Sequence, residues 1–180
     1  KMLINFIEQL INGLRTGSIY ALIAIGYTMV YGIAKMINFA HGDIIMVGAY
    51  ALYFSISVLG LPVPAALLIT VIVCSVLGVL IEKIAYKPLR KAPPLAVLIT
   101  AIGMSFFLQS SSLLFFGSTP IPFQSVIPNV NIKLGPVVIS SITLVTLAVT
   151  AIAMTLLTLF INKTKLGSAM RAVSEDKGAA

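Results

Sequence analysis

The residues best suited to chemistry are gathered between Asn38 and Asp43, a stretch that holds the single histidine of the chain. Asn38 and His41 are three positions apart and would share a helical face, and Gly42 would allow a kink. Ionisable side chains in an apolar setting are candidates for a transport path. The alternative is an interfacial turn in which His41 and Asp43 cap a helix over residues 44–57.

A second polar group lies in the apolar run over residues 95–116. Ser105, Gln109 and Ser112 stand at i, i+4 and i+7, so they would form one polar face of a helix. Two interpretations are open, namely hydrogen bonds to a neighbouring helix or contact with a watery solute path.

The sequence offers few residues that could carry out catalysis. His41 and Asp43 could serve as acid and base of an intramembrane enzyme, but two positions apart on a helix they point in different directions. The sequence has no zinc-ligand spacing, no nucleotide-binding glycine loop and no Ser-His-Asp arrangement. Its one cysteine, Cys74, excludes a disulfide within the chain. We therefore expect no catalytic residue, no metal site and no cofactor bound by this chain.

The composition indicates which solvent surrounds these residues. Of 180 residues, 59% are hydrophobic and 9% are charged, and the mean hydropathy is +1.08. These values exclude a disordered tail, a nucleic-acid-binding arm and an ordinary soluble domain. The net charge of +7 is instead expected of the cytoplasmic loops of a membrane protein.

Gaps between the charged clusters define the elements that must position the polar residues. They predict an all-α polytopic transmembrane helix bundle with about five hydrophobic segments, forming a single domain over residues 1–180. One of the segments carries a candidate break between Asn38 and Asp43. The segments are residues 16–34, two spans on either side of residues 60–64, residues 95–116 and residues 137–161, with residues 117–132 as a loop.

The first segment has two special features. Residues 1–15 read as an amphipathic lead-in, which either lies on the membrane interface or extends the first span. Gly17, Ala21 and Ala24 belong to a stripe of small residues, which favours close packing against another helix over a pore wall.

Basic clusters set the orientation. Four positive charges lie within residues 83–91 and four more follow Asn162, so both regions are expected in the cytoplasm. The side of the N-terminus is left open, because a re-entrant segment at residues 38–43 would reverse it.

The tail over residues 163–180 predicts a short amphipathic helix on the cytoplasmic side. Leu166, Met170 and Val173 recur at i, i+4 and i+7, with Arg171 and Glu175 beside them. Two roles are open, a membrane-surface helix without a partner or a helix that packs into a groove on another subunit.

Several strings resemble the start of branched-chain amino acid ABC importer permeases of the LivH type. Residues 17–24, 37–43 and 48–50 resemble the opening of that family, and residues 82–90 resemble its first basic cytoplasmic loop. Residues 164–176 resemble the beginning of its coupling region. Family members continue for several more spans, so the resemblance implies that this chain is the N-terminal portion of a permease.

The resemblance implies a transport subunit that is not itself an enzyme. It would work in the bacterial inner membrane with a second permease subunit, two cytoplasmic ATPase subunits that use the ATP, and a periplasmic binding protein that delivers leucine, isoleucine or valine. The polar residues themselves suggest a substrate path at Asn38, His41, Gly42, Asp43, Ser105 and Gln109. The resemblance implies ATPase coupling at Gly167, Met170, Arg171, Val173, Glu175 and Asp176. The alternatives are a permease for urea, short-chain amides or another small polar solute, or a fragment that does not transport.

Overall fold

The computed structural model describes residues 2–34, 37–89, 92–123, 128, 130–134 and 137–175. The chain forms two compact units. The first combines Lys1–Lys35 with Ser125–Ala180, and the second is Met36–Gln124. The all-α prediction is confirmed, apart from one two-stranded hairpin, whereas the single domain over the whole chain stays a prediction.

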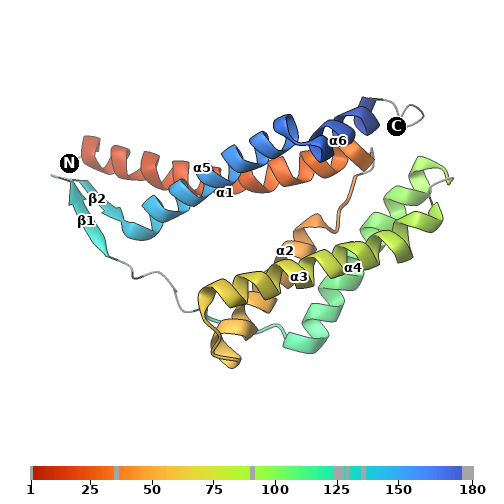
Figure 1. Cartoon of the computed structure of the whole chain (residues 1–180). Helices are drawn as coiled ribbons and strands as arrows, with labels where there is room; N and C mark the ends of the chain where they lie inside the picture. Colours follow the sequence, from red (N-terminus) through yellow and green to blue (C-terminus); the bar gives the residue numbers. More distant parts are fainter. Residues whose placement is uncertain are drawn as a thin grey trace. The chain divides into compact units, whose positions relative to one another are not determined.

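The first unit is built on two long helices, α1 (Met2–Ala34) and α5 (Ser141–Lys163). They lie side by side and run in the same direction (Figure 1). The strand β2 (Val137–Ser140), directly before α5, is held by Glu8 near the start of α1 through its carboxylate and the Val138 N–H, at 3.1 Å. The helix α6 (Lys165–Glu175), directly after α5, also contacts α1.

The hairpin corrects two expectations. The strand β1 (Asn131–Leu134) pairs antiparallel with β2, and Ile132 lies opposite Ile139. Residues 117–132 are therefore not loop throughout, and the helix expected over residues 137–161 begins only at the end of β2. The physical reason is local, because β2 starts with three β-branched residues in a row, which favour a strand.

Side-chain hydroxyl groups accept hydrogen bonds from backbone N–H groups at the starts of α5 and α6. The Ser140 Oγ accepts a hydrogen bond from the Ile142 N–H at 3.2 Å, at the start of α5. The Thr164 Oγ1 accepts one from the Gly167 N–H at 3.0 Å, at the start of α6. Each bond satisfies a backbone donor that the helix itself leaves without a partner.

The α1 helix joins the amphipathic lead-in to the first expected span without a break, so the lead-in extends that span. Among the described residues, four helices are long and apolar enough to cross a membrane. They are His41–Val58, Val63–Leu89, Pro94–Phe116 and Ser141–Lys163. The expected count of five becomes four among the described residues, because α1 is not one of the helices that meet these criteria of length and hydropathy.

The second unit carries α2 (His41–Tyr53), α3 (Val63–Ile81) and α4 (Pro94–Phe116). Short turns of other helix types extend the first two: η1 (Phe54–Val58) and η2 (Glu82–Tyr86) are π-helical, and η3 (Lys87–Leu89) is a 3₁₀ turn. The helix expected over residues 44–57 therefore begins at His41, and its last turn is π-helical.

Glycine and proline separate these helices. Gly60 adopts φ 63° between η1 and α3, and Gly117 adopts φ 78° after α4, conformations that favour glycine. Pro62 and Pro93 directly precede α3 and α4, where a missing N–H costs little.

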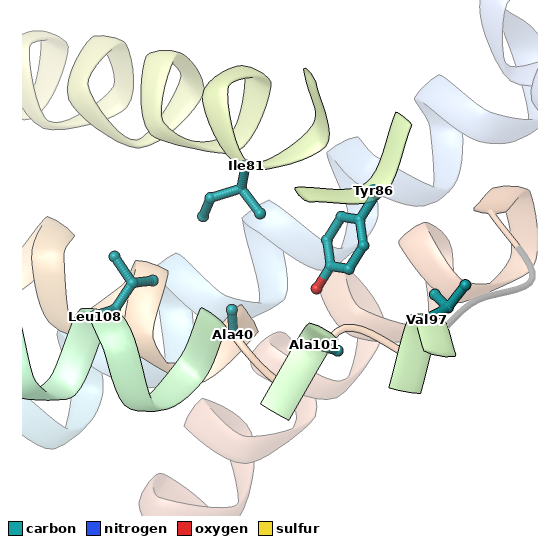
Figure 2. Packing of buried hydrophobic residues seen from close by; sticks show 6 residues of the cluster. All are labelled: Ala40, Ile81, Tyr86, Val97, Ala101 and Leu108. Carbon is teal, nitrogen blue, oxygen red and sulfur yellow. The ribbon is translucent and has the colours of Figure 1, made fainter. Parts of the chain in front are cut away.

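The core of the second unit is small and lies between the ends of its helices. Buried apolar side chains from three elements and the turn before α2 meet there, as Figure 2 shows: Ala40, Ile81, Tyr86, Val97, Ala101 and Leu108. Much of the remaining apolar surface is exposed, including Leu114 at 84% and Phe115 at 82%. Such a surface suits a lipid environment rather than water.

Candidate functional site

Asp43 joins α2 to α4 through its carboxylate. It lies in the first turn of α2, where the positive end of the helix dipole favours a carboxylate, and it is only 7% exposed. The Ser105 hydroxyl donates to its Oδ2 at 2.5 Å, and the Gln109 amide donates to its Oδ1 at 3.0 Å. Asp43 therefore lies near the N-terminus of its helix, as expected, but its carboxylate is used between helices.

The two donors on α4 also bond to each other. Ser105 and Gln109 are one helical turn apart, and the Gln109 Nε2 donates to the Ser105 Oγ at 3.1 Å. The serine hydroxyl thus accepts from Gln109 while it donates to Asp43. We call Asp43, Ser105 and Gln109 the polar cluster. Of the two open interpretations of this α4 face, the interhelical hydrogen bond is present in the structure.

Asn38 organises the turn that precedes α2. Its Oδ1 accepts from the Ala40 N–H at 3.0 Å, and its backbone oxygen accepts from the His41 N–H at 3.2 Å. The Tyr86 hydroxyl donates to the same Oδ1 at 2.8 Å, and Figure 2 shows the ring reaching from η2 toward the segment of Ala40. The side-chain oxygen of Asn38 therefore fixes a local turn and ties it to the end of α3.

The position of the break differs from one expectation. Residues 37–40 are not helical, so Asn38 and His41 do not share a helical face. Gly42 lies inside α2, in its first turn, and the non-helical residues come before His41. His41 itself is half-buried in the first turn. A helix break between α1 and α2 was expected and is confirmed, but Asn38 rather than Gly42 shapes it.

A cluster of aromatic side chains lies at the other end of the contact between α2 and α4. The rings of Tyr50 and Phe116 stack with centroids 4.1 Å apart, and those of Tyr53 and Phe123 are 6.2 Å apart. Tyr50, Tyr53 and Phe123, but not Phe116, border a cavity of about 380 Å³, here called the apolar pocket. It is lined by Met46, Ala49, Tyr50, Leu52, Tyr53, Ile121 and Phe123. Sequence reasoning missed this pocket, although Met46, Tyr50 and Tyr53 follow helical spacing from Asp43.

Comparisons with known proteins show which protein family the chain belongs to. Residues 9–180 match the family model described as branched-chain amino acid transport system / permease component. The chain belongs to this permease family. It is 45% identical over 185 residues to the high-affinity branched-chain amino acid transport system permease protein BraD of Pseudomonas aeruginosa, covering 96% of this chain and 60% of BraD.

Two further relatives are the high-affinity branched-chain amino acid transport system permease proteins LivH of two other bacteria. LivH of Salmonella typhimurium is 42% identical and LivH of Escherichia coli strain K12 is 41% identical, each over 184 residues that cover 95% of this chain and 59% of the relative. The chain thus spans about three fifths of the length of these relatives. No solved structure matches it.

The expected coupling residues of this permease lie on α6, apart from Asp176, which is outside the described residues. Gly167 is buried, Met170 and Val173 are half-buried, and Arg171 and Glu175 are exposed. The Arg171 guanidinium donates to the Asn162 side-chain oxygen at 3.3 Å, which ties α6 to the end of α5. The structure thus gives α6 a fixed place in its own unit.

The small-residue stripe of α1, formed by Gly17, Ala21 and Ala24, has no close neighbour at Gly17. Gly17 and Ala24 are exposed and Ala21 is half-buried. A Cβ placed on Gly17 would meet no atom within 4 Å. Packing of this stripe against another helix stays a prediction.

In the described part of the chain, no three His, Cys, Asp or Glu side chains group together as metal ligands would.

Proposed function

We propose that this chain is part of the membrane-spanning permease subunit of an ATP-driven importer of branched-chain amino acids. The observation that carries the proposal is the 41–45% identity, over nearly the whole chain, to bacterial permeases described as high-affinity branched-chain amino acid transporters. Four apolar helices of membrane-spanning length support a multi-pass location in the bacterial inner membrane.

The division of labour follows from what the sequence contains. It has no G-x-x-x-x-G-K-[ST] loop, so ATP would be bound and hydrolysed by two partner ATPase subunits in the cytoplasm. A second permease subunit would complete the membrane path, and a periplasmic binding protein would deliver leucine, isoleucine or valine. The chain itself would be a transport subunit without catalytic residues. Coupling requires that transport and hydrolysis bias the same two global states.

The substrate would pass beside the polar residues at the start of α2. Asn38, His41, Gly42 and Asp43 lie in or before its first turn, and Ser105 and Gln109 of α4 bond to the Asp43 carboxylate. A non-helical backbone at membrane depth is tolerated only beside protein or water, and the turn over residues 37–40 meets that condition through Tyr86.

Reconstituted transport tests the proposal. The complete permease subunit, its partner permease, the ATPases and the binding protein would be placed in liposomes, and uptake of radiolabelled L-leucine would be measured with ATP inside or outside. We expect uptake that requires ATP on the ATPase side and that valine and isoleucine inhibit. A non-hydrolysable ATP analogue is the control. Uptake of urea or acetamide without uptake of leucine would favour the alternative solute class.

A further inference from the structure

The polar cluster and the apolar pocket lie along one face of α2. Asp43, Met46, Tyr50 and Tyr53 stand at i, i+3, i+7 and i+10, the spacing of residues that share a helical face. The last three line the pocket, whereas Asp43 belongs to the cluster. One face therefore changes from a carboxylate to an apolar lining within a few residues.

The facing side of α4 changes in the same way. Ser105 and Gln109 bond to Asp43, and two turns further on Phe116 stacks on Tyr50. The contact between α2 and α4 is thus polar at the start of α2 and aromatic at its end. The apolar pocket adjoins this contact and is lined by α2 together with Ile121 and Phe123, without a residue of α4. A ligand reaching from the polar cluster into the pocket would need a charged or polar head and an apolar body.

The Asp43 carboxylate has acceptor capacity left. Each of its oxygens accepts one bond from a neutral donor, and an ionised carboxylate offers about four acceptor positions. Its negative charge lies in a helix of membrane-spanning length, where a cationic partner would lower its cost. Asp43 itself is buried, whereas Gln109 is exposed, so a ligand would approach the carboxylate from the side of Gln109.

The spacing suits an amino acid. Met46, the lining residue nearest to Asp43, lies about 4.5 Å from it along the helix axis, at about 1.5 Å per residue, so the near end of the pocket is the part within reach. In leucine, about four bonds of about 1.5 Å lead from the ammonium nitrogen to the terminal methyl groups, a reach of about 5 Å. The pocket, of about 380 Å³, is large enough for such a side chain.

We infer that Asp43 binds the ammonium group of an amino acid whose branched side chain occupies the apolar pocket. Ser105 and Gln109 are positioning residues that hold the carboxylate in place. The inference rests on the proposed function, because it names the contacts that a branched-chain amino acid makes on its way through the permease. The competing explanation is that Asp43 only ties α2 to α4.

A binding experiment separates these two roles. The complete permease pair with its ATPases, in nanodiscs and without the binding protein, would be titrated with labelled L-leucine by equilibrium dialysis. Competition with isoamylamine, which keeps the ammonium and lacks the carboxylate, and with 4-methylpentanoate, which lacks the ammonium, reports which group is recognised. Omitting the binding protein removes its own affinity from the measurement.

Asp43→Asn is the decisive variant because the amide keeps the shape and can still bond to Ser105 and Gln109. We expect it to weaken leucine and isoamylamine binding by at least about tenfold, the loss expected for a hydrogen bond to a charged group, and to leave 4-methylpentanoate unchanged. Glu8→Gln, which removes a carboxylate from α1, is the matched control. Equal weakening of all three ligands would assign Asp43 a structural role and overturn the inference.

The pocket is tested separately. Ala49→Phe fills it and should weaken leucine binding by about tenfold while alanine binding changes little, because only leucine buries a large side chain there. Ile45→Phe, on the same helix outside the pocket lining, is the control. If wild type binds no leucine, or if Ala49→Phe has no effect, the site is wrong even where uptake is intact. Binding at Asp43 without uptake would instead contradict the proposed transport function.

Discussion

Gly48 and Cys74 bring α2 and α3 into close contact. A Cβ placed on Gly48 would stand 2.9 Å from the Cys74 Sγ, closer than such atoms approach in proteins. The thiol also points toward the Ile44 carbonyl, with its Sγ 3.7 Å from that oxygen. A glycine therefore sets the distance between these two helices, as small residues do in membrane proteins.

Gly48→Ala should destabilise the permease by about 1–2 kcal/mol, because the added methyl group displaces the Cys74 side chain. The midpoint of thermal unfolding of the purified subunit measures the effect. Gly78→Ala is the matched control, since a Cβ there meets nothing within 4 Å. Cys74→Ala should restore stability to the Gly48→Ala variant. A double variant no more stable than the single one would show that the thiol is not the obstacle.

The hydrogen bond between Tyr86 and Asn38 should hold the break before α2. Tyr86→Phe removes the donor at 2.8 Å but keeps the ring in the core, so we expect a loss of about 1 kcal/mol. Asn38→Ala should cost more, because the Ala40 N–H also loses its acceptor. Thermal unfolding is the measurement, and Tyr20→Phe, at a tyrosine that is 68% exposed, is the control. Equal midpoints for Asn38→Ala and wild type would contradict this role.

The sequence predicts local features of the site better than its contacts. Charge gaps place the helices, and the polar string before Asp43 indicates the break, because both signals lie within one segment. The bond between Asp43 and Gln109 joins residues 66 positions apart, and no periodicity in one sequence reports which helices pair. The hairpin is missed for another reason, since strands of four residues are too short for an alternating pattern to stand out.

The parallel arrangement of α1 and α5 predicts where the start of α1 lies. Glu8 bonds to the backbone of β2, and the hairpin is expected outside the cytoplasm, so Glu8 should be outside as well. In a Cys74→Ala background, Glu8→Cys and Asn131→Cys should react with an impermeant maleimide added to intact cells. Lys83→Cys and Lys165→Cys should react only after the cells are opened. Labelling of Lys83→Cys from outside would show that the orientation is the reverse. If Asn131→Cys reacted but Glu8→Cys did not, the start of α1 would not lie beside the hairpin outside the cell.

Gly167 should be essential to the turn between α5 and α6. A Cβ at this position would collide with the backbone carbonyl of Ile161, which cannot move aside as a flexible side chain could. Gly167→Ala should therefore displace α6 and reduce co-purification of the ATPase subunits with the complete permease. Gly32→Ala is the control, because a Cβ there meets nothing within 4 Å. Full ATPase capture by Gly167→Ala would show that the position of α6 does not matter for assembly.

The exposed side of α6 should carry the contact with an ATPase subunit. Leu166 is 64% exposed, whereas Met170 and Val173 are half-buried in the first unit, so Leu166 is the apolar residue most available to a partner groove. Leu166→Asp should leave the permease folded but lower ATPase capture by at least about tenfold, since burying an unpaired carboxylate is costly. Ser168→Asp places the same charge on another exposed part of α6 and should have little effect. Met170→Asp should instead lower the thermal stability of the permease itself, because that side chain packs inside its own unit. If Leu166→Asp and Ser168→Asp retain ATPase subunits equally well, α6 does not dock through Leu166, and the membrane-surface role becomes the better explanation.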